Sequence, residues 1–165
     1  MLKIEKLAKT HNRKSFDSSS EPLNRFIKNL ARQHADRGIS RTFVLIEEDH
    51  PKIILGYFTL TICEVIPADI PDPRLQRYPH PIPAAKLVRL AVSLKHQKKG
   101  MGKILMIEAL RRTIAISENA GLIGIFVDAK DKFAADYYQQ YEFIPHENNP
   151  LLLFLPIETI RQLFK

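Results

Sequence analysis

The sequence predicts an α/β or α+β protein in which helices cover both faces of a sheet. Short apolar runs, rich in β-branched and aromatic residues, alternate along the chain with segments of helical periodicity. The length of 165 residues, with 45% hydrophobic and 26% charged residues, suits one folded domain with its own core. We therefore expect a single domain over residues 1–165.

Strand patterns occupy residues 2–7, 42–47, 53–66, 86–94, 122–127 and 151–155. The segment 53–66 is the longest, and it is rich in the Ile, Thr, Phe and Tyr side chains that favour a pleated sheet. Between Pro67 and Pro83 lie six prolines, which lack an N–H donor and disfavour both helix and sheet ladder. We expect a semi-rigid surface loop there.

Four helices are predicted. The first begins after Ser19 or Ser20, which can cap it, and ends at Gly38, with apolar residues at helical spacing between them. The others are expected over residues 100–119, 132–140 and 156–164. The helix at 100–119 is apolar over much of its circumference, which suits packing under a sheet.

The chain is basic, with a net charge of +7 and a pI near 9.6. Such a charge favours a polyanionic partner, although solubility alone is an alternative explanation. On the first predicted helix, basic residues lie three and four positions apart on one side, and others continue beyond its end: Arg25, Lys28, Arg32, Arg37 and Arg41. This face either contacts a polyanion or is a solvated helix face.

A glycine-bearing, cationic turn joins the strand at 86–94 to the helix at 100–119, with the sequence Gln97-Lys98-Lys99-Gly100-Met101-Gly102-Lys103. Its glycines allow close approach of a ligand, and the first N–H groups of the next helix point at any anion bound there. A P-loop is excluded, because Ile104 stands where a hydroxyl would bind Mg²⁺. A dinucleotide fingerprint is excluded because Leu105 replaces its third glycine.

The turn matches the pattern Gln/Arg-x-x-Gly-x-Gly/Ala, and the downstream segment Ala134-Ala135-Asp136-Tyr137-Tyr138-Gln139-Gln140-Tyr141-Glu142-Phe143 is similar to Ala-x-x-Phe-Tyr-x-x-x-Gly-Phe. The turn resembles the acetyl-CoA signature of the GNAT superfamily of N-acetyltransferases, and the downstream segment resembles a second motif of that superfamily, in the expected order. The resemblance implies a mixed, mostly antiparallel twisted sheet that binds acetyl-CoA as co-substrate at its splayed central strands.

Further segments extend the resemblance over nearly the whole chain, to the GNAT toxins of type II toxin-antitoxin systems: Phe16-Asp17, Leu23-Asn24-Arg25-Phe26, Ser40-Arg41-Thr42-Phe43-Val44, Gly56-Tyr57-Phe58-Thr59-Leu60, Arg77-Tyr78-Pro79, Arg89-Leu90-Ala91-Val92 and Leu153-Phe154-Leu155-Pro156. Members acetylate the α-amine of aminoacyl-tRNA, which blocks translation. A ribbon-helix-helix antitoxin holds them inactive, and they commonly form dimers. Two alternatives stay open: an N-acetyltransferase of a small amine, protein N-terminus or lysine, and a non-catalytic acyl-CoA or nucleic-acid binding module.

The resemblance also implies roles for particular residues. The backbone of Leu90, Ala91 and Val92 would bind the pantetheine arm, and N–H groups from Gln97 to Lys103 would hold the pyrophosphate. The residues that would hold the pyrophosphate are Gln97, Lys98, Lys99, Gly100, Met101, Gly102 and Lys103. The five basic residues of the first helix and its continuation would contact tRNA phosphates.

Tyr138 matches the tyrosine of the downstream motif, and we expect it to protonate the leaving thiolate. A phenol with a pKa of about 10 is protonated at neutral pH. Tyr137 and Tyr141 are the alternatives. Glu64 is either a general base or an exposed strand residue. Glu142 stands where the family has Gly, which predicts a somewhat altered turn.

No metal site is expected, because the six histidines lack metal-ligand spacing and Cys63 is the single cysteine. No membrane association is expected either, since the longest clean apolar run, residues 151–155, is too short to cross a bilayer. We therefore expect a cytoplasmic protein.

Overall fold

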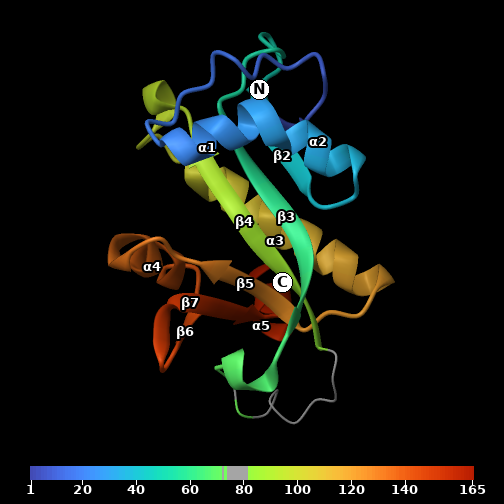
Figure 1. Cartoon of the computed structure of the whole chain (residues 1–165), viewed down its shortest axis with the longest axis vertical. Coiled ribbons are helices and arrows are strands. Elements are labelled where there is room, and N and C mark those ends of the chain that lie inside the picture. The colour runs from blue at the N-terminus through green and yellow to red at the C-terminus, as the bar shows by residue number, and fades with distance from the viewer. Residues whose placement is uncertain (72, 74–81) are drawn as a thin grey trace. The chain divides into compact units, whose positions relative to one another are not determined.

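The computed structural model of the protein describes residues 1–71, 73 and 82–165 (Figure 1). Among these residues seven strands form one sheet, in the order β1-β2-β3-β4-β5-β7-β6. They are β1 (Leu2–Lys6), β2 (Arg41–Glu47), β3 (Gly56–Val65), β4 (Ile82–Val92), β5 (Gly124–Asp128), β6 (Ile144–His146) and β7 (Asn149–Pro156). β4 and β5 pair in parallel, while β1 with β2, β2 with β3, β5 with β7 and β6 with β7 are antiparallel. The predicted mixed, mostly antiparallel sheet is confirmed.

The chain divides into two compact units. Unit 1 holds Met1–Thr61 and Val88–Ala109, and unit 2 holds Ile62–Leu87 and Leu110–Lys165. Unit 1 therefore contains the predicted phosphate turn, whereas unit 2 contains Tyr138. The single domain over residues 1–165 stays a prediction.

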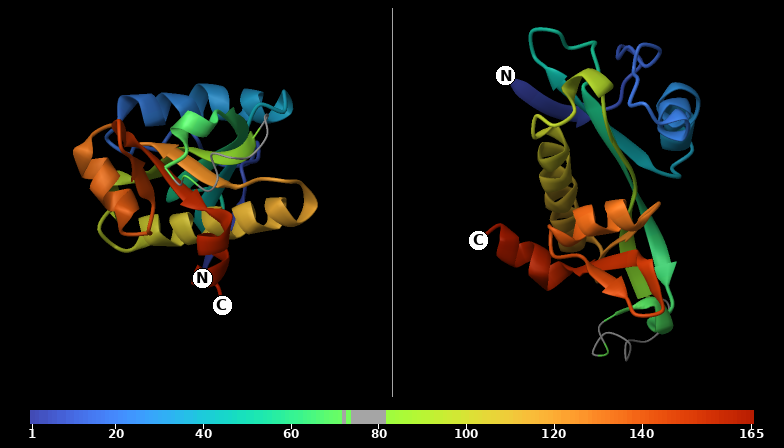
Figure 2. Two further views of the ribbon diagram at one scale, coloured as in Figure 1. Left: turned by 90° about the horizontal axis from the view of Figure 1, so that it is seen from below. Right: turned by 90° about the vertical axis from the view of Figure 1, so that its left-hand side faces the viewer.

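In unit 1, two helices and one half of a third cover the two faces of β2 and β3. α1 (Glu21–Arg25) and α2 (Ala31–Asp36) lie on one face, and the first half of α3 (Met101–Asn119) lies on the other (Figure 2). Phe26 on the helical side and Tyr57 on β3 are both fully buried, with their rings stacked at 6.3 Å. The amphipathic pattern of the first helix thus builds the core of this unit.

The first helix is not the uninterrupted α-helix that the spacing predicts. A π-helical turn, η1 (Phe26–Leu30), separates α1 from α2, and the N–H of Ala31 donates to the carbonyl of Phe26. Leu30, one α-turn after Phe26, is 36% exposed, whereas Ala31, one residue later, is fully buried. The wider turn therefore places Ala31 rather than Leu30 beside Phe26 in the core.

β4 begins earlier than the sequence predicts. The strand starts at Ile82 rather than at residue 86, so it includes Pro83. Pro83 has no N–H, but its carbonyl accepts a hydrogen bond from Ile123 N at 3.0 Å, which is the half of the ladder that a proline can still make. Of the expected proline-rich loop, Pro67–Asp69 forms a short 3-10 turn, η2, and residues 72 and 74–81 lie outside the described part.

In unit 2, β5, β7 and β6 pair antiparallel, and α4 (Lys132–Gln139) and α5 (Ile157–Leu163) pack beside them (Figure 1). The rings of Phe126 and Phe154 lie 4.5 Å apart in its core. β6 was not predicted, because its three residues are too few to show an alternating pattern.

Candidate functional site

The predicted phosphate turn has the backbone geometry of an anion site. A short 3-10 turn, η4 (Leu94–His96), leads into it, and α3 begins at Met101. Lys98 and Gly100 have positive φ angles of 63° and 83°. Changes of backbone hand between neighbouring residues turn successive N–H groups toward one side, and the first N–H groups of α3 have no intrahelical acceptor. The turn can therefore donate several hydrogen bonds to one phosphate group.

The charged side chains of this turn are available to a ligand. Lys98, Lys99 and Lys103 are all exposed, and no ion pair joins them to an acidic residue within the described ranges. An added Cβ at Gly100 would meet no atom within 4 Å, so open space adjoins the backbone there. Backbone donors, positive charge and free space coincide at this one turn.

The strand before the turn has a stretch of backbone that is unpaired on the side of β5. The parallel pairing of β4 with β5 ends at Leu87 and Val127, whereas β4 continues to Val92. Leu90 and Ala91 therefore lie beyond the last pair recorded between these two strands. Backbone N–H and C=O groups on such an edge can bind an extended ligand as another strand would.

β3 approaches this stretch of β4 so closely that only glycine fits. A Cβ on Gly56 would lie 2.9 Å from the carbonyl oxygen of Ala91 and 2.9 Å from Cδ1 of Leu105. In the sequence Gly56 stands within a segment that resembles the toxin family, and that resemblance alone does not reveal its steric role. A glycine at the start of an otherwise aromatic and β-branched strand was the available signal.

The predicted catalytic tyrosine lies on α4 in unit 2. Asp131 caps this helix, since its carboxylate accepts a hydrogen bond from Ala134 N at 2.8 Å. The Tyr138 ring packs against Phe143 with centroids 5.7 Å apart. Burial raises the pKa of the Tyr138 phenol above its ordinary value, so the group keeps its proton at neutral pH.

The two alternative tyrosines differ from Tyr138 in their hydrogen bonding. The hydroxyls of Tyr137 and Tyr141 lie 3.2 Å apart and bond to each other. Burial, and then this bond, raise the pKa of Tyr137. The Tyr138 hydroxyl has no hydrogen bond in the part of the chain that the structure describes. Of the three phenols, that of Tyr138 is therefore the one whose proton is not already shared with a neighbouring phenol.

Glu142 keeps the turn that a glycine would make. It has a positive φ of 71° itself, and its N–H donates to the carbonyl of Gln139 at 3.0 Å. The altered turn that the sequence suggested is not observed. Instead the residue occupies a left-handed conformation, at a cost of roughly 1–2 kcal/mol for a side chain with a Cβ.

The five basic residues predicted for tRNA have different surroundings. Arg25 lies 3.7 Å from Glu21, one turn earlier, and the Arg41 guanidinium donates to the carbonyl of Ala35. Arg32 is half-buried and Arg37 is exposed. Because the π-turn lies between Arg25 and Arg32, the spacing of three and four residues does not place them on one α-helical face.

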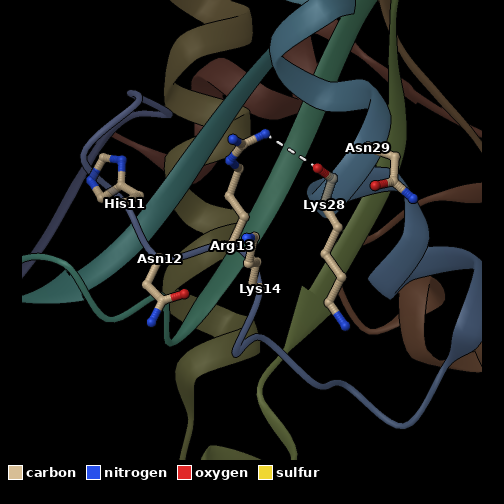
Figure 3. A pocket seen from close by; sticks show the side chains of 6 residues that line it. All are labelled: His11, Asn12, Arg13, Lys14, Lys28 and Asn29. Atoms are coloured by element: carbon tan, nitrogen blue, oxygen red, sulfur yellow. Dashed lines mark hydrogen bonds between the residues drawn. The ribbon is translucent and has the colours of Figure 1, made fainter.

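Lys28 instead lines a basic pocket, defined here as the space among His11, Asn12, Arg13, Lys14, Lys28 and Asn29 (Figure 3). Its volume is about 420 Å³. Nη1 of Arg13 donates to the carbonyl of Lys28 at 3.2 Å, which fixes the guanidinium against η1. No carboxylate is among the lining residues, so three cationic side chains surround an open space. Arg13 and Lys14 were not predicted, because they precede the helix in a polar segment without periodicity.

Comparison with known proteins places the chain in a family. The Acetyltransferase (GNAT) family matches residues 3–143. This chain belongs to the GNAT acetyltransferase family. Among GNAT proteins it is 30% identical, over 149 residues, to a tRNA-acetylating toxin of Mycobacterium tuberculosis, covering 90% of this chain and 88% of that protein.

Two solved structures are similar to this chain over nearly their whole length. AtaT complexed with acetyl-methionyl-tRNAfMet has a TM-score of 0.90 and 29% identity, with 100% of each chain covered. A tyrosine-to-phenylalanine mutant of the AtaT toxin, bound to the C-terminus of the antitoxin AtaR and acetyl-CoA, has a TM-score of 0.83 and 28% identity, with 99% of this chain and 98% of that chain covered. The predicted GNAT fold and its likeness to the tRNA-acetylating toxins are thus confirmed.

Within the described residues, no three His, Cys, Asp or Glu side chains gather in a way that could hold a metal ion. No helix in the same residues is long and apolar enough to cross a bilayer.

Glu64, the candidate general base, lies exposed on β3.

Proposed function

We propose that this chain transfers the acetyl group of acetyl-CoA to the α-amine of aminoacyl-tRNA and thereby blocks translation. The observation that carries the proposal is the match, over 100% of both chains, to AtaT in complex with acetyl-methionyl-tRNAfMet. The sequence match to the tRNA-acetylating toxin of M. tuberculosis supports it independently.

The chemistry suits an α-amine. An α-amino group has a pKa of about 7.7–8.0, whereas a lysine has one of about 10.4. A substantial fraction of the α-amine is therefore neutral and nucleophilic at pH 7, so attack needs no strong base. The amine nitrogen attacks the thioester carbonyl carbon, the tetrahedral intermediate collapses with cleavage of the C–S bond, and the ammonium loses its extra proton to water.

The leaving thiolate then takes a proton from Tyr138 in this proposal. Two features of the phenol support the role: burial keeps it protonated, and its hydroxyl is not bonded to either neighbouring tyrosine. Solvent returns the proton to the phenolate after product leaves.

Acetyl-CoA binding is assigned to unit 1. We place the pyrophosphate on the N–H groups of Gln97, Lys98, Lys99, Gly100, Met101, Gly102 and Lys103, and the pantetheine arm on the backbone of Leu90, Ala91 and Val92. The positive φ angles of the turn, and the end of β4 that has no pairing with β5, support this placement. The cofactor is a co-substrate, and the transfer as proposed uses no metal.

The tRNA contacts are assigned to the basic residues Arg25, Lys28, Arg32, Arg37 and Arg41. To these the basic pocket adds Arg13 and Lys14. Phosphate contacts of this kind position the nucleic acid and make its affinity depend on salt.

The proposal extends to partners and location. AtaT binds the C-terminus of the antitoxin AtaR, and we propose that a ribbon-helix-helix antitoxin neutralises this chain in the same manner. We further propose that residues 1–165 act as one catalytic domain, that the protein forms a homodimer, and that it acts in the cytoplasm, where aminoacyl-tRNA is used.

The test is to incubate the protein with labelled acetyl-CoA, a mixed aminoacyl-tRNA pool, and, in separate reactions, polyamines and a protein extract. We expect label on aminoacyl-tRNA, and none on uncharged tRNA. Label on amines or proteins alone would identify the other class of N-acetyltransferase. Binding of acetyl-CoA or tRNA with no transfer to any acceptor would identify a non-catalytic binding module.

A further inference from the structure

A buried polar network joins the first helix to the phosphate turn within unit 1. Its centre is Asn24 on α1, which is 7% exposed, together with Ser18, which is 6% exposed. Polar side chains are buried this deeply only when they are hydrogen-bonded. Neither residue lies in the phosphate turn or in the pantetheine stretch, so their burial needs another explanation.

The carboxamide of Asn24 fixes the turn at residues 17–20. Its oxygen accepts hydrogen bonds from Ser18 N at 2.8 Å and from Ser18 Oγ at 2.9 Å. The side-chain nitrogen of Asn24 donates to Oδ1 of Asp17 at 2.9 Å. Oδ1 of Asp17 also accepts a hydrogen bond from Ser19 N at 2.9 Å. Ser19 is held at a positive φ of 72°. These bonds lower the pKa of Asp17, first through Ser19 N–H and then through Asn24, so the carboxylate is charged at neutral pH.

The fixed turn in turn holds the segment that leads into the phosphate turn. The carbonyl of Asp17 accepts from Leu94 N at 2.7 Å, and the carbonyl of Ser18 accepts from Nε2 of Gln97 at 3.0 Å. Nε2 of Gln97 also donates to the carbonyl of Val92 at 3.1 Å. The side-chain amide nitrogen of Gln97 is therefore engaged with protein carbonyls, directly before the positive φ of Lys98.

We propose that Asn24 is a positioning residue for acetyl-CoA: through Asp17, Ser18 and the Gln97 side chain it fixes the backbone of the phosphate turn in its anion-binding geometry. The inference rests on the proposed acetyl-CoA function. It adds a role for residues that touch no substrate atom. In this inference the Gln97 side chain supports the turn, and only the Gln97 backbone N–H faces the pyrophosphate.

Positioning matters here because the binding groups are backbone N–H donors. A backbone donor cannot adjust its direction by changing a rotamer, so its alignment depends on what holds the chain on either side. On the helical side α3 provides that support, through Ile104 N and the carbonyl of Gly100 at 3.3 Å. On the strand side the support is the network around Asn24.

The test measures the dissociation constant of acetyl-CoA by calorimetry for the full-length protein and four variants. Loss of three side-chain hydrogen bonds in Asn24→Ala, or of two in Gln97→Ala, should raise the dissociation constant about fivefold to tenfold. Because Ser18 links the two residues, while Asn24 also acts through Asp17 and Gln97 also holds the Val92 carbonyl, the double variant should weaken binding by less than the product of the two single effects. Gln33→Ala removes an exposed carboxamide from α2, and it should bind as the wild type does.

A charge swap separates positioning from simple destabilisation. In Asn24→Asp two carboxylates face each other, so acetyl-CoA binding should weaken. Adding Asp17→Asn restores one amide donor opposite one carboxylate, so the double variant should recover most of the wild-type affinity. In the acetylation assay, the weakened variants should show a raised KM for acetyl-CoA with kcat nearly unchanged.

The outcomes distinguish this inference from the function on which it rests. A wild-type protein that does not bind acetyl-CoA contradicts the proposed function. A wild type that binds, together with Asn24→Ala and Gln97→Ala variants that bind equally well, overturns the positioning role alone. Gln97 is exposed, so its variant should stay folded, and equal thermal midpoints would confirm this. If Asn24→Asp weakens acetyl-CoA binding and adding Asp17→Asn does not restore the affinity, the inference is also overturned.

Discussion

The phosphate turn of unit 1 and the tyrosine helix of unit 2 are built on opposite plans. The turn presents main-chain donors, and its side chains, among them three exposed lysines, add only charge. The α4 region presents side chains, with three tyrosines crowded on one short helix and the turn after it. A backbone site should tolerate side-chain changes but not changes of backbone conformation. A side-chain site should fail when one functional group is removed.

The largest effect is expected at Tyr138. Tyr138→Phe removes one oxygen and leaves the ring packed on Phe143, so the fold and acetyl-CoA binding should persist. Loss of a proton donor should lower kcat by about 10²–10⁴-fold, measured by acetyl transfer in single-turnover reactions. Expression of this variant should no longer arrest translation.

Tyr137→Phe is the matched control, because it removes a phenol from the same helix. It breaks the bond to Tyr141 and should lower kcat only slightly. A Tyr138→Phe protein as active as wild type, or a larger loss in Tyr137→Phe, contradicts the assignment.

A smaller effect is expected from a methyl group at Gly56. In Gly56→Ala the new Cβ lies 2.9 Å from the Ala91 carbonyl oxygen, so the backbone of β4 must move. Such overpacking costs about 1–3 kcal/mol of unfolding free energy, measured by denaturant titration. Acetyl-CoA binding should also weaken, since Ala91 belongs to the proposed pantetheine stretch. Gly121→Ala is the control, because its Cβ meets nothing within 4 Å; equal effects at the two sites would rule out the steric explanation.

Relief of backbone strain should change the free energy of unfolding by a smaller amount. The same substitution can be made in the phosphate turn and after α4, so it compares the two regions directly. Lys98 and Glu142 both have positive φ, so replacing either with Gly should stabilise the fold by about 0.5–1 kcal/mol after the entropy cost of glycine. Thermal unfolding measures the change. Lys98→Gly should lose a little acetyl-CoA affinity with its charge, whereas Glu142→Gly should not. Glu142→Ala keeps the Cβ and should show no gain, and a gain there would contradict strain as the cause.

The smallest expected change is in the pH profile. Burial disfavours the Tyr138 phenolate and raises the pKa of this group above about 10, so its proton is present throughout the neutral and mildly alkaline range. The rate should rise as the α-amine loses its proton, near pH 7–8, and then stay level through the mildly alkaline range. A fall in kcat between pH 8 and 9 that is absent from Tyr138→Phe would contradict a raised pKa.

Sequence patterns predicted the boundary between the turn and α3, because Gly100 and the apolar periodicity of α3 mark the same place. Sequence patterns did not predict the features that depend on tertiary contacts. Residues 26–31 satisfy α-helical spacing as written, and only the core shows that Ala31 must replace Leu30 beside Phe26. Asn24 and Ser18 read as ordinary turn and helix-start residues, because burial of a polar side chain depends on partners distant in the sequence, such as Gln97. Pro83 favoured a loop in the sequence, but β4 can include it because its carbonyl accepts a hydrogen bond from Ile123 N.

The π-turn at Phe26–Leu30 has a consequence for how such chains diverge. Because it holds one residue more than an α-turn, it is a place where the chain can lose a residue inside a helix without losing the helix. Deletion of Lys28 or Asn29 would convert the segment to continuous α-helix, in which the bond from the N–H of Ala31 to the carbonyl of Phe26 becomes an ordinary α-helical bond and both residues stay in the core. In an alignment of relatives, a one-residue gap within this helix, rather than in a flanking loop, would mark chains that have made that conversion.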